Sequence, residues 1–174
     1  MREQETKRAL IISGGSLEED FASAYLKDQN FDMIIAVDSG LKGALDLGLS
    51  VDAAVGDFDS ADPVTLAEGH EHREIHWEVH RPEKDETDTE LALRKAMALG
   101  CEEIAVLGAT GGRADHMMGN VQLLFQCLQK GVFAYLADPQ NKIYLLDGER
   151  EYQKGQVWGK YISFLPLTER VYGI

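Results

Sequence analysis

Apolar runs of strand length alternate with helical patterns along most of the chain. Continuous apolar runs predict buried strands at residues 8–13, 32–37, 52–55, 103–107 and 132–137. Apolar residues at helical spacing follow several of these runs, and they predict helices over residues 17–25, 40–47, 87–99 and 114–130. An order of strand, helix, strand, helix is typical of a parallel sheet that helices cover on both faces.

Three of the predicted helices carry further signals. Thr87 and Glu90 form a capping box, Glu90 can pair with Arg94 four residues on, and Gly100 is a typical stop. In the other two helices, one face is expected to meet the core. Its members are Leu17, Phe21, Ala24 and Tyr25 in the first helix and Met117, Val121, Leu124, Phe125 and Leu128 in the last.

Residues 74–80 alternate between apolar and polar side chains, which predicts a half-exposed strand. The histidines of this region are expected on the solvent face of that strand, which disfavours a zinc site. They are His70, His72, His76 and His80.

The pattern changes after a turn at residues 138–141. Residues 142–146, 149–153 and 156–164 are strand-like, and no helical pattern separates them. They predict antiparallel hairpins. The expected organisation is therefore an α/β domain over residues 1–138, followed by a second unit over 139–174.

Composition narrows the classes of protein that fit this pattern. The 174 residues are 44% apolar and carry a net charge of −13, which disfavours a protein that coats nucleic acid or an anionic membrane. No apolar run is long enough to span a bilayer, and the first residues lack the apolar core of a signal peptide. The two cysteines, Cys101 and Cys127, indicate a reducing compartment. We therefore expect a soluble cytoplasmic protein.

Acidic residues gather in two loops that follow strand-like runs. Asp57 and Asp59 stand two positions apart after a buried strand, where their carboxylates could converge on one hard cation. Asp85 and Asp88 lie in a second acidic knot beside Lys84. Each loop alone is also compatible with ordinary turn and helix-cap roles, since acids in a first helical turn are stabilised by the helix dipole.

A third loop, residues 108–116, combines glycines with charged side chains. Its glycine-rich turn between a buried strand and a helix suits a phosphate, and Arg113 adds a fork of donors. Asp115 and His116 then stand in the first turn of the helix. The shorter turns after the first two strands, Ser13–Ser16 and Val37–Gly40, are also compatible with plain strand–helix connections.

Several familiar signatures are missing from the sequence. It has neither a P-loop nor a dinucleotide fingerprint, and it has no nucleophile elbow. Carboxylates repel phosphate, whereas the glycine and arginine loop attracts it. The presence of the carboxylates and of the glycine and arginine loop at one edge of the sheet is explained if Mg²⁺ bridges the acids to a polyphosphate. The residues thus favour metal-assisted phosphoryl or pyrophosphoryl transfer, with the substrate left open.

The three loops together resemble the thiamine pyrophosphokinase family. Residues 56–60 (GDFDS), 84–88 (KDETD) and 111–116 (GGRADH, followed by Asn120) are similar to that family's motifs and occur in its order. The resemblance implies a Rossmann-like nucleotide-binding sheet followed by the beginning of an antiparallel β-sandwich, in a homodimer. It also implies that the protein makes thiamine diphosphate and AMP from ATP and thiamine with Mg²⁺.

The resemblance implies roles for particular residues. It gives Mg²⁺ binding to Asp57, Asp59 and Asp88, with Arg113 and Asp115 completing the catalytic group. It gives nucleotide contacts to Gly14, Gly15, Asp38, Ser39, Lys84, Thr110, Gly111, Gly112 and Arg113. It gives substrate contacts to Asp85, His116 and Asn120.

Other functions stay open at this point. One is a pyrophosphokinase for another hydroxymethyl heterocycle, such as a pterin. A second is a nucleotide-binding fragment without catalysis, because the sequence stops at Ile174, inside the expected sandwich. The four aspartates favour an enzyme over a mere binding module. A metal-dependent phosphohydrolase comes last, since no water-activating histidine cluster is evident.

Overall fold

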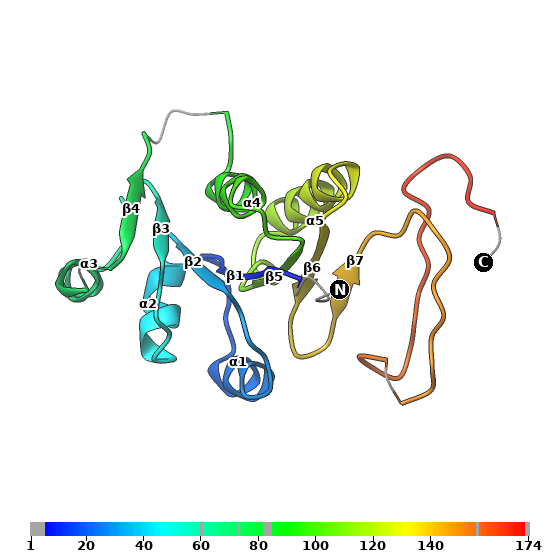
Figure 1. Cartoon of the computed structure of the whole chain (residues 1–174), viewed down its shortest axis with the longest axis horizontal. Coiled ribbons are helices and arrows are strands. Elements are labelled where there is room, and N and C mark those ends of the chain that lie inside the picture. The colour runs from blue at the N-terminus through cyan, green and yellow to red at the C-terminus, as the bar shows by residue number, and fades with distance from the viewer. Residues whose placement is uncertain (1–5, 60, 73, 82–84, 156, 173–174) are drawn as a thin grey trace, which may run out of the picture.

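The computed structural model describes residues 6–59, 61–72, 74–81, 85–155 and 157–172 (Figure 1). A seven-stranded sheet has the strand order β4-β3-β2-β1-β5-β6-β7. Strands β1 to β6 are parallel, and β7 pairs antiparallel with β6. The strands are β1 (Arg8–Ile12), β2 (Met33–Val37), β3 (Ala53–Gly56), β4 (His76–Val79), β5 (Glu103–Leu107), β6 (Phe133–Ala137) and β7 (Lys142–Tyr144). The predicted α/β fold with a mostly parallel sheet is confirmed.

Helices cover both faces of this sheet (Figure 1). On one face, α4 (Asp88–Ala98) and α5 (Ala114–Gln129) pack against the strands. On the other face lie α1 (Glu19–Leu26), α2 (Gly40–Asp46) and α3 (Pro63–Glu71). Each face of the sheet has its own hydrophobic core, and alternate residues of β1 pack into one or the other. Ile11 faces α4 and Ile12 faces α2. Because both faces of the inner strands are buried, these strands are continuous apolar runs in the sequence.

Helix α3 is not predicted by the apolar pattern. It has few apolar residues, but its start is signalled by Asp62 and Pro63: the Asp62 carboxylate accepts the Thr65 amide at 3.2 Å, and proline occupies the first turn. His70 lies within this helix and packs on the Trp77 ring, and His72 follows its end. Their expected place on the exposed face of a strand is therefore wrong.

Two residues of the predicted core-facing stripes are exposed. In α1 it is Ala22 that is fully buried, whereas Ala24 is exposed. In α5 the buried residues are Leu123, Leu124 and Cys127, while Phe125 is 44% exposed. Spacings of three and four residues both fit a helical stripe, so the pattern leaves the rotation of the helix uncertain by about one residue.

The chain after β7 differs from its prediction. The described residues of 149–153 and 156–164 form no strand, so the predicted hairpins are not formed. A strand needs a partner edge and a face to bury, and here Tyr161 and Leu165 are almost fully exposed. The division at residue 139 stays a prediction. Across the described ranges, no helix has both the length and the hydropathy needed to cross a membrane.

Candidate active site at the carboxyl edge of the sheet

A cleft of about 1000 Å³ opens where the strand order reverses. The chain builds outward from β1 through β2 and β3 to β4, then returns to place β5 on the other side of β1. The loops that follow β1 and β5 therefore diverge, and open parallel sheets bind ligands in the crevice left between such loops. The cleft is lined by the turns after β1, β2 and β5 and by the first turns of α4 and α5.

The turns after β1 and β5 are in direct backbone contact at the base of the cleft, before they lead to opposite faces of the sheet. The Ser13 amide donates to the Leu107 carbonyl at 2.8 Å, and the Gly15 amide donates to the Gly108 carbonyl at 2.8 Å. A Cβ atom at Gly15 would collide with the Gly108 carbonyl oxygen. Glycine is thus needed at this position for the two backbones to approach.

The glycine-rich turn after β5 leads into α5. Gly111 and Gly112 both have φ in the left-handed region, at 82° and 64°. Because they lack side chains, the backbone of this turn is open to a ligand at the positive end of the helix. Asn120, nearly two turns into α5, donates from its side-chain amide to the Ala109 carbonyl at 2.9 Å and holds the turn against the helix.

Arg113 and Asp115 form an exposed ion pair at the mouth of the cleft. The guanidinium donates to both carboxylate oxygens, at 3.1 and 2.6 Å. The hydrogen bond from Arg113 lowers the pKa of Asp115 to about 2. In this arrangement Arg113 is held by a carboxylate, so a phosphate would have to compete with Asp115 for it.

We expect Arg113→Gln to return the pKa of Asp115 from about 2 toward its ordinary value of 3.8. A lowered carboxyl pKa stabilises the fold above the ordinary value, and this stabilisation is lost as the pH falls toward 2. NMR titration of the Asp115 carboxyl carbon measures the shift, with Lys42→Gln, on α2, as the control. An Asp115 that titrates normally in the unchanged protein would contradict the ion pair.

Acidic side chains meet at the other side of the cleft. The Asp38 carboxylate accepts the amides of Asp57 and Phe58 at 3.1 and 3.3 Å. Burial raises the pKa of Asp38 to about 6, and the charge of Asp88 together with a hydrogen bond to it adds to the rise. The charge of Asp57 contributes in the same direction. The carboxylates of Asp88 on α4 and of Asp57 after β3 are thus close enough to repel that of Asp38, the residue after β2.

This acidic group fits a divalent cation by its chemistry. Carboxylates that repel each other in a half-buried site gain stability when a cation neutralises them, and Mg²⁺ prefers oxygen ligands. Within the described ranges, no three His, Cys, Asp or Glu side chains form a complete metal-binding group. Mg²⁺ commonly takes only one or two protein carboxylates, and substrate phosphates and water complete its shell.

The first turn of α4 is fixed from two sides. The Thr87 hydroxyl accepts the Glu90 amide at 3.2 Å, and Glu90 pairs with Arg94 at 2.7 Å. The predicted cap and ion pair are confirmed. One residue after Asp88, the buried Thr89 hydroxyl lies 2.9 Å from that of Ser13, which ties α4 to the end of β1.

The structure brings most of the predicted site residues to this cleft. Its lining includes Gly14, Gly15, Asp38, Ser39, Asp88, Thr110, Gly111, Gly112, Arg113, Asp115, His116 and Asn120. Asp57 is outside this lining but joins it through Asp38, and Asp59 donates its amide to the Asp57 carboxylate. Asp85 is exposed and outside the lining. Lys84 and Ser60 lie outside the described residues.

Sequence reasoning missed a polar wall of the cleft. Thr89 on α4 and the α5 residues Gln122, Leu123 and Gln126 line it, and Gln126 donates to the Glu90 carboxylate at 3.2 Å. Together with Gly119, these α5 residues recur at spacings of three and four, so they occupy one helix face. That spacing can be read from the sequence, but a search for stripes of apolar residues alone does not find it.

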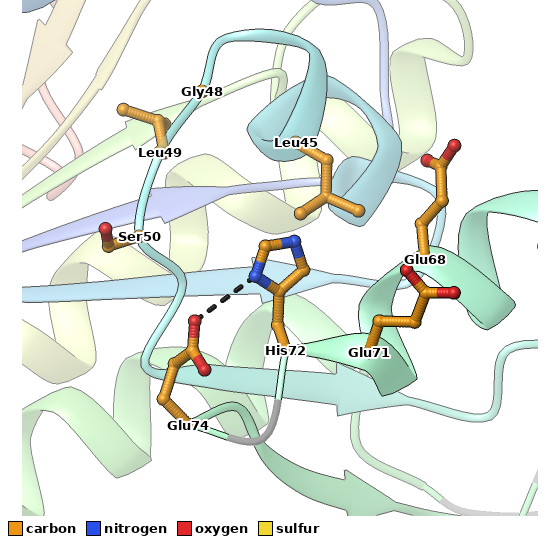
Figure 2. Close-up of a pocket in the computed structure, with 8 residues that line it drawn as sticks. All are labelled: Leu45, Gly48, Leu49, Ser50, Glu68, Glu71, His72 and Glu74. Carbon is orange, nitrogen blue, oxygen red and sulfur yellow. Dashed lines mark hydrogen bonds and ion pairs between the residues drawn. The ribbon is translucent and has the colours of Figure 1, made fainter.

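A second hollow, of about 340 Å³, lies at the opposite end of the strands (Figure 2). It is bordered by the end of α2, the end of α3 and the turns before β3 and β4, and His72 pairs there with Glu74 at 3.2 Å. None of the predicted site residues borders it. It therefore lies apart from the candidate site.

The fold and the cleft define the chain as an α/β protein with a cleft at the reversal point of a mostly parallel sheet. A family model, "Thiamin pyrophosphokinase, catalytic domain", matches residues 26–136. The chain belongs to the thiamin pyrophosphokinase family. Among curated proteins it is similar to thiamine pyrophosphokinase of Bacillus subtilis (strain 168), with 38% identity over 144 residues.

That match covers 79% of this chain and 64% of the relative, so the chain spans a little under two thirds of the relative's length. Solved structures agree with this assignment. Thiamine pyrophosphokinase from Bacillus subtilis matches with a TM-score of 0.69 and 32% identity, covering 79% of this chain and 63% of that one. The enzyme from Geobacillus thermodenitrificans matches with a TM-score of 0.65 and 29% identity, covering 78% and 61%.

Proposed function

We propose that this protein transfers the pyrophosphoryl group of ATP to the hydroxyl of thiamine, giving thiamine diphosphate and AMP, with Mg²⁺ as cofactor. The observation that carries the proposal is the meeting of the glycine-rich loop after β5, the turn after β2 and the first turn of α4 at one cleft. A glycine-rich anion-binding turn, an arginine and an acidic group line the same hollow. Membership of the thiamin pyrophosphokinase family supports the choice of substrates.

The nucleotide would lie over the backbone contact between the β1 and β5 turns. The backbone amides of Gly111 and Gly112 and the N-terminus of α5 suit its phosphates. Gly14, Ser39 and Thr110 border the same space. Arg113 would exchange Asp115 for a phosphate oxygen, because a bidentate guanidinium suits either anion.

Asp57, Asp59 and Asp88 would hold Mg²⁺, which neutralises charge on the phosphates as it builds up in the transition state. The acidic group at Asp38 and Asp88 supports this role, since its mutual repulsion is relieved by a cation. The protein's own contribution is position: α4 presents Asp88 from a capped first turn that is tied to β1.

The thiamine hydroxyl would attack the β-phosphorus in line as AMP leaves. A carboxylate near the hydroxyl, Asp88 or Asp115, would accept its proton. Asp85, His116 and Asn120 would contact this substrate. Most of the rate enhancement is expected from positioning and electrostatics, as is general for phosphoryl transfer.

Finer features of the protein belong to the same proposal. We propose that the sheet is a Rossmann-like nucleotide-binding unit and that residues 139–174 begin a β-sandwich domain that completes the thiamine site in a homodimer. A cytoplasmic location fits the two buried free cysteines and the net charge of −13. The strand order, with β1 beside both β2 and β5, supports the nucleotide-binding assignment.

The test is AMP formation from ATP and Mg²⁺, measured with thiamine, with a hydroxymethyl pterin and with neither. We expect AMP only with thiamine. AMP formed with the pterin instead would favour the other pyrophosphokinase. Calorimetric titration with a non-hydrolysable ATP analogue tests the alternative of a nucleotide-binding module without catalysis. Binding of the analogue without any AMP formation from ATP would overturn the catalytic proposal in favour of that module.

A further inference from the structure

Asp38 makes one hydrogen bond to β3 and two to the acidic loop that follows it. Its own amide donates to the Val55 carbonyl at 3.1 Å, which continues the β2–β3 ladder beyond the end of β2. Its carboxylate oxygen Oδ1 then accepts the amides of Asp57 and Phe58. A single side chain directly after β2 thus satisfies consecutive backbone donors in the loop that carries Asp57 and Asp59.

The backbone on both sides of this contact is held in an uncommon conformation. Asp38 has φ 46° and Phe58 has φ 55°, and they are the non-glycine residues with positive φ in the described ranges. Such a conformation is unfavourable for a residue with a side chain and persists only where the surroundings impose it. Phe58 is buried against the Trp77 ring, with 5.2 Å between centroids, and its amide is fixed by Asp38.

Gly56 makes room for the Asp38 carboxylate. A Cβ atom built at Gly56 would fall on Oδ1 of Asp38 and come within 3.2 Å of the Asp38 amide nitrogen. Gly56 also has φ 155°, which L side chains rarely adopt. The glycine that opens the GDFDS stretch therefore has a direct physical reason in this structure: the carboxylate of Asp38 occupies the place of its side chain.

We infer that Asp38 is the positioning residue of the acidic loop, holding the backbone of residues 57–58 through its Oδ1 so that the Asp57 carboxylate stays close to the cleft that Asp38 and Asp88 line. This inference rests on the proposed function, because it assigns to Asp38 a task in building the cation site rather than only a nucleotide contact. The decisive property is the acceptor oxygen rather than the negative charge.

Two substitutions separate these properties. Asp38→Asn keeps an oxygen acceptor and tolerates positive φ, while it removes the charge. Asp38→Gly adopts positive φ readily but removes the acceptor altogether. Gly56→Ala should displace the carboxylate and act like Asp38→Gly. Since both would disturb one contact, their effects should be less than additive in the double variant.

The experiment is amide hydrogen exchange by NMR at Asp57 and Phe58, without metal or substrate. We expect both amides to be protected in the unchanged protein and in Asp38→Asn. In Asp38→Gly and Gly56→Ala, we expect exchange at both sites to be at least about tenfold faster, the factor that corresponds to the loss of one hydrogen bond. A parallel titration with Mg²⁺ should show a half-saturating concentration raised about tenfold or more in Asp38→Gly.

Asp52→Gly is the matched control. Its carboxylate also bridges β3 and β2, accepting the Ile34 amide at 2.7 Å, but at the opposite end of the strands. It should leave the Asp57 and Phe58 amides as protected as before. The inference is overturned if these amides exchange freely in the unchanged protein, or if Asp38→Asn loses protection as fully as Asp38→Gly. Because exchange needs no substrate, failure to form AMP would sink the proposed function without altering this result.

Discussion

Asp88→Asn is expected to lower the rate of thiamine-dependent AMP formation by roughly a thousandfold, the scale seen when one preorganised electrostatic group is removed. Asparagine fills the same volume but carries no charge to hold a cation. Asp88 lines the cleft and lies against Asp38. The rate at saturating ATP, thiamine and Mg²⁺ measures the loss.

The same substitution should not weaken the fold. Burial and Asp88 together raise the pKa of Asp38 to about 6 from an ordinary 3.8. A carboxyl whose folded pKa is raised costs stability as the pH rises from about 4 to 6, and that cost persists above 6. With Asp88 neutral, the pKa of Asp38 should fall toward its ordinary value, so the free energy of unfolding at pH 7 should be equal to or greater than that of the unchanged protein at pH 7.

Asp46→Asn is the matched control for this prediction. Asp46 is the last residue of α2, away from the cleft, and pairs with Lys42 on the surface. Exposed pairs of this kind contribute little to stability, so both activity and unfolding should be unchanged. Full activity in Asp88→Asn would remove this residue from the cation site. An unfolded variant would instead show that Asp88 stabilises the fold.

The inner strands could be predicted because a strand that is buried on both faces is a continuous apolar run in the sequence. Residues 103–107 are apolar except for Glu103 at the start, and they form β5 at those same bounds. The location of the cleft followed from the same reasoning, since the ends of parallel strands meet at one edge of the sheet. Helix α3 was missed because its apolar pattern is weak and only its cap at Asp62 marks it.

The contacts that organise the site could not be predicted in this way. Asp38 and Gly56 are far apart in the sequence, and their mutual fit arises only when β2 and β3 pair. From its own position Asp38 fitted a plain strand–helix connection, and only the family resemblance gave it a nucleotide contact. Likewise, Gln126 and Glu90 meet across two helices. Such pairs depend on packing geometry, which local spacing does not encode.

The segment after β7 illustrates a different limit. Alternation at residues 156–164 predicts strands, yet a strand is stable only beside another edge and over a buried face. The described residues there keep Tyr161 and Leu165 exposed. Local pattern thus gives a tendency to form a strand, and the partner decides whether the strand forms.

Gly15→Ala should have the second large effect, because it separates the two loops that form the base of the cleft. The added methyl group would meet the carbonyl oxygen of Gly108, and both backbones are fixed by neighbouring strands. Neither can move without breaking the hydrogen bond from the Gly15 amide to that oxygen. We expect a loss of about 2 kcal/mol in the free energy of unfolding, typical of overpacking. Affinity for a non-hydrolysable ATP analogue should fall by at least about tenfold.

Gly148→Ala is the control for the loss of a glycine as such, because an added Cβ there meets no atom within 4 Å. Urea unfolding and calorimetric titration of the ATP analogue measure the two effects for both variants. The backbone contact between the β1 and β5 turns supports both the fold and the base of the cleft. Binding and stability should therefore fall together in Gly15→Ala. A variant with normal stability but weak binding would place Gly15 in contact with the ligand alone. A variant with normal values of both would show that the two turns are not held together at the base of the cleft.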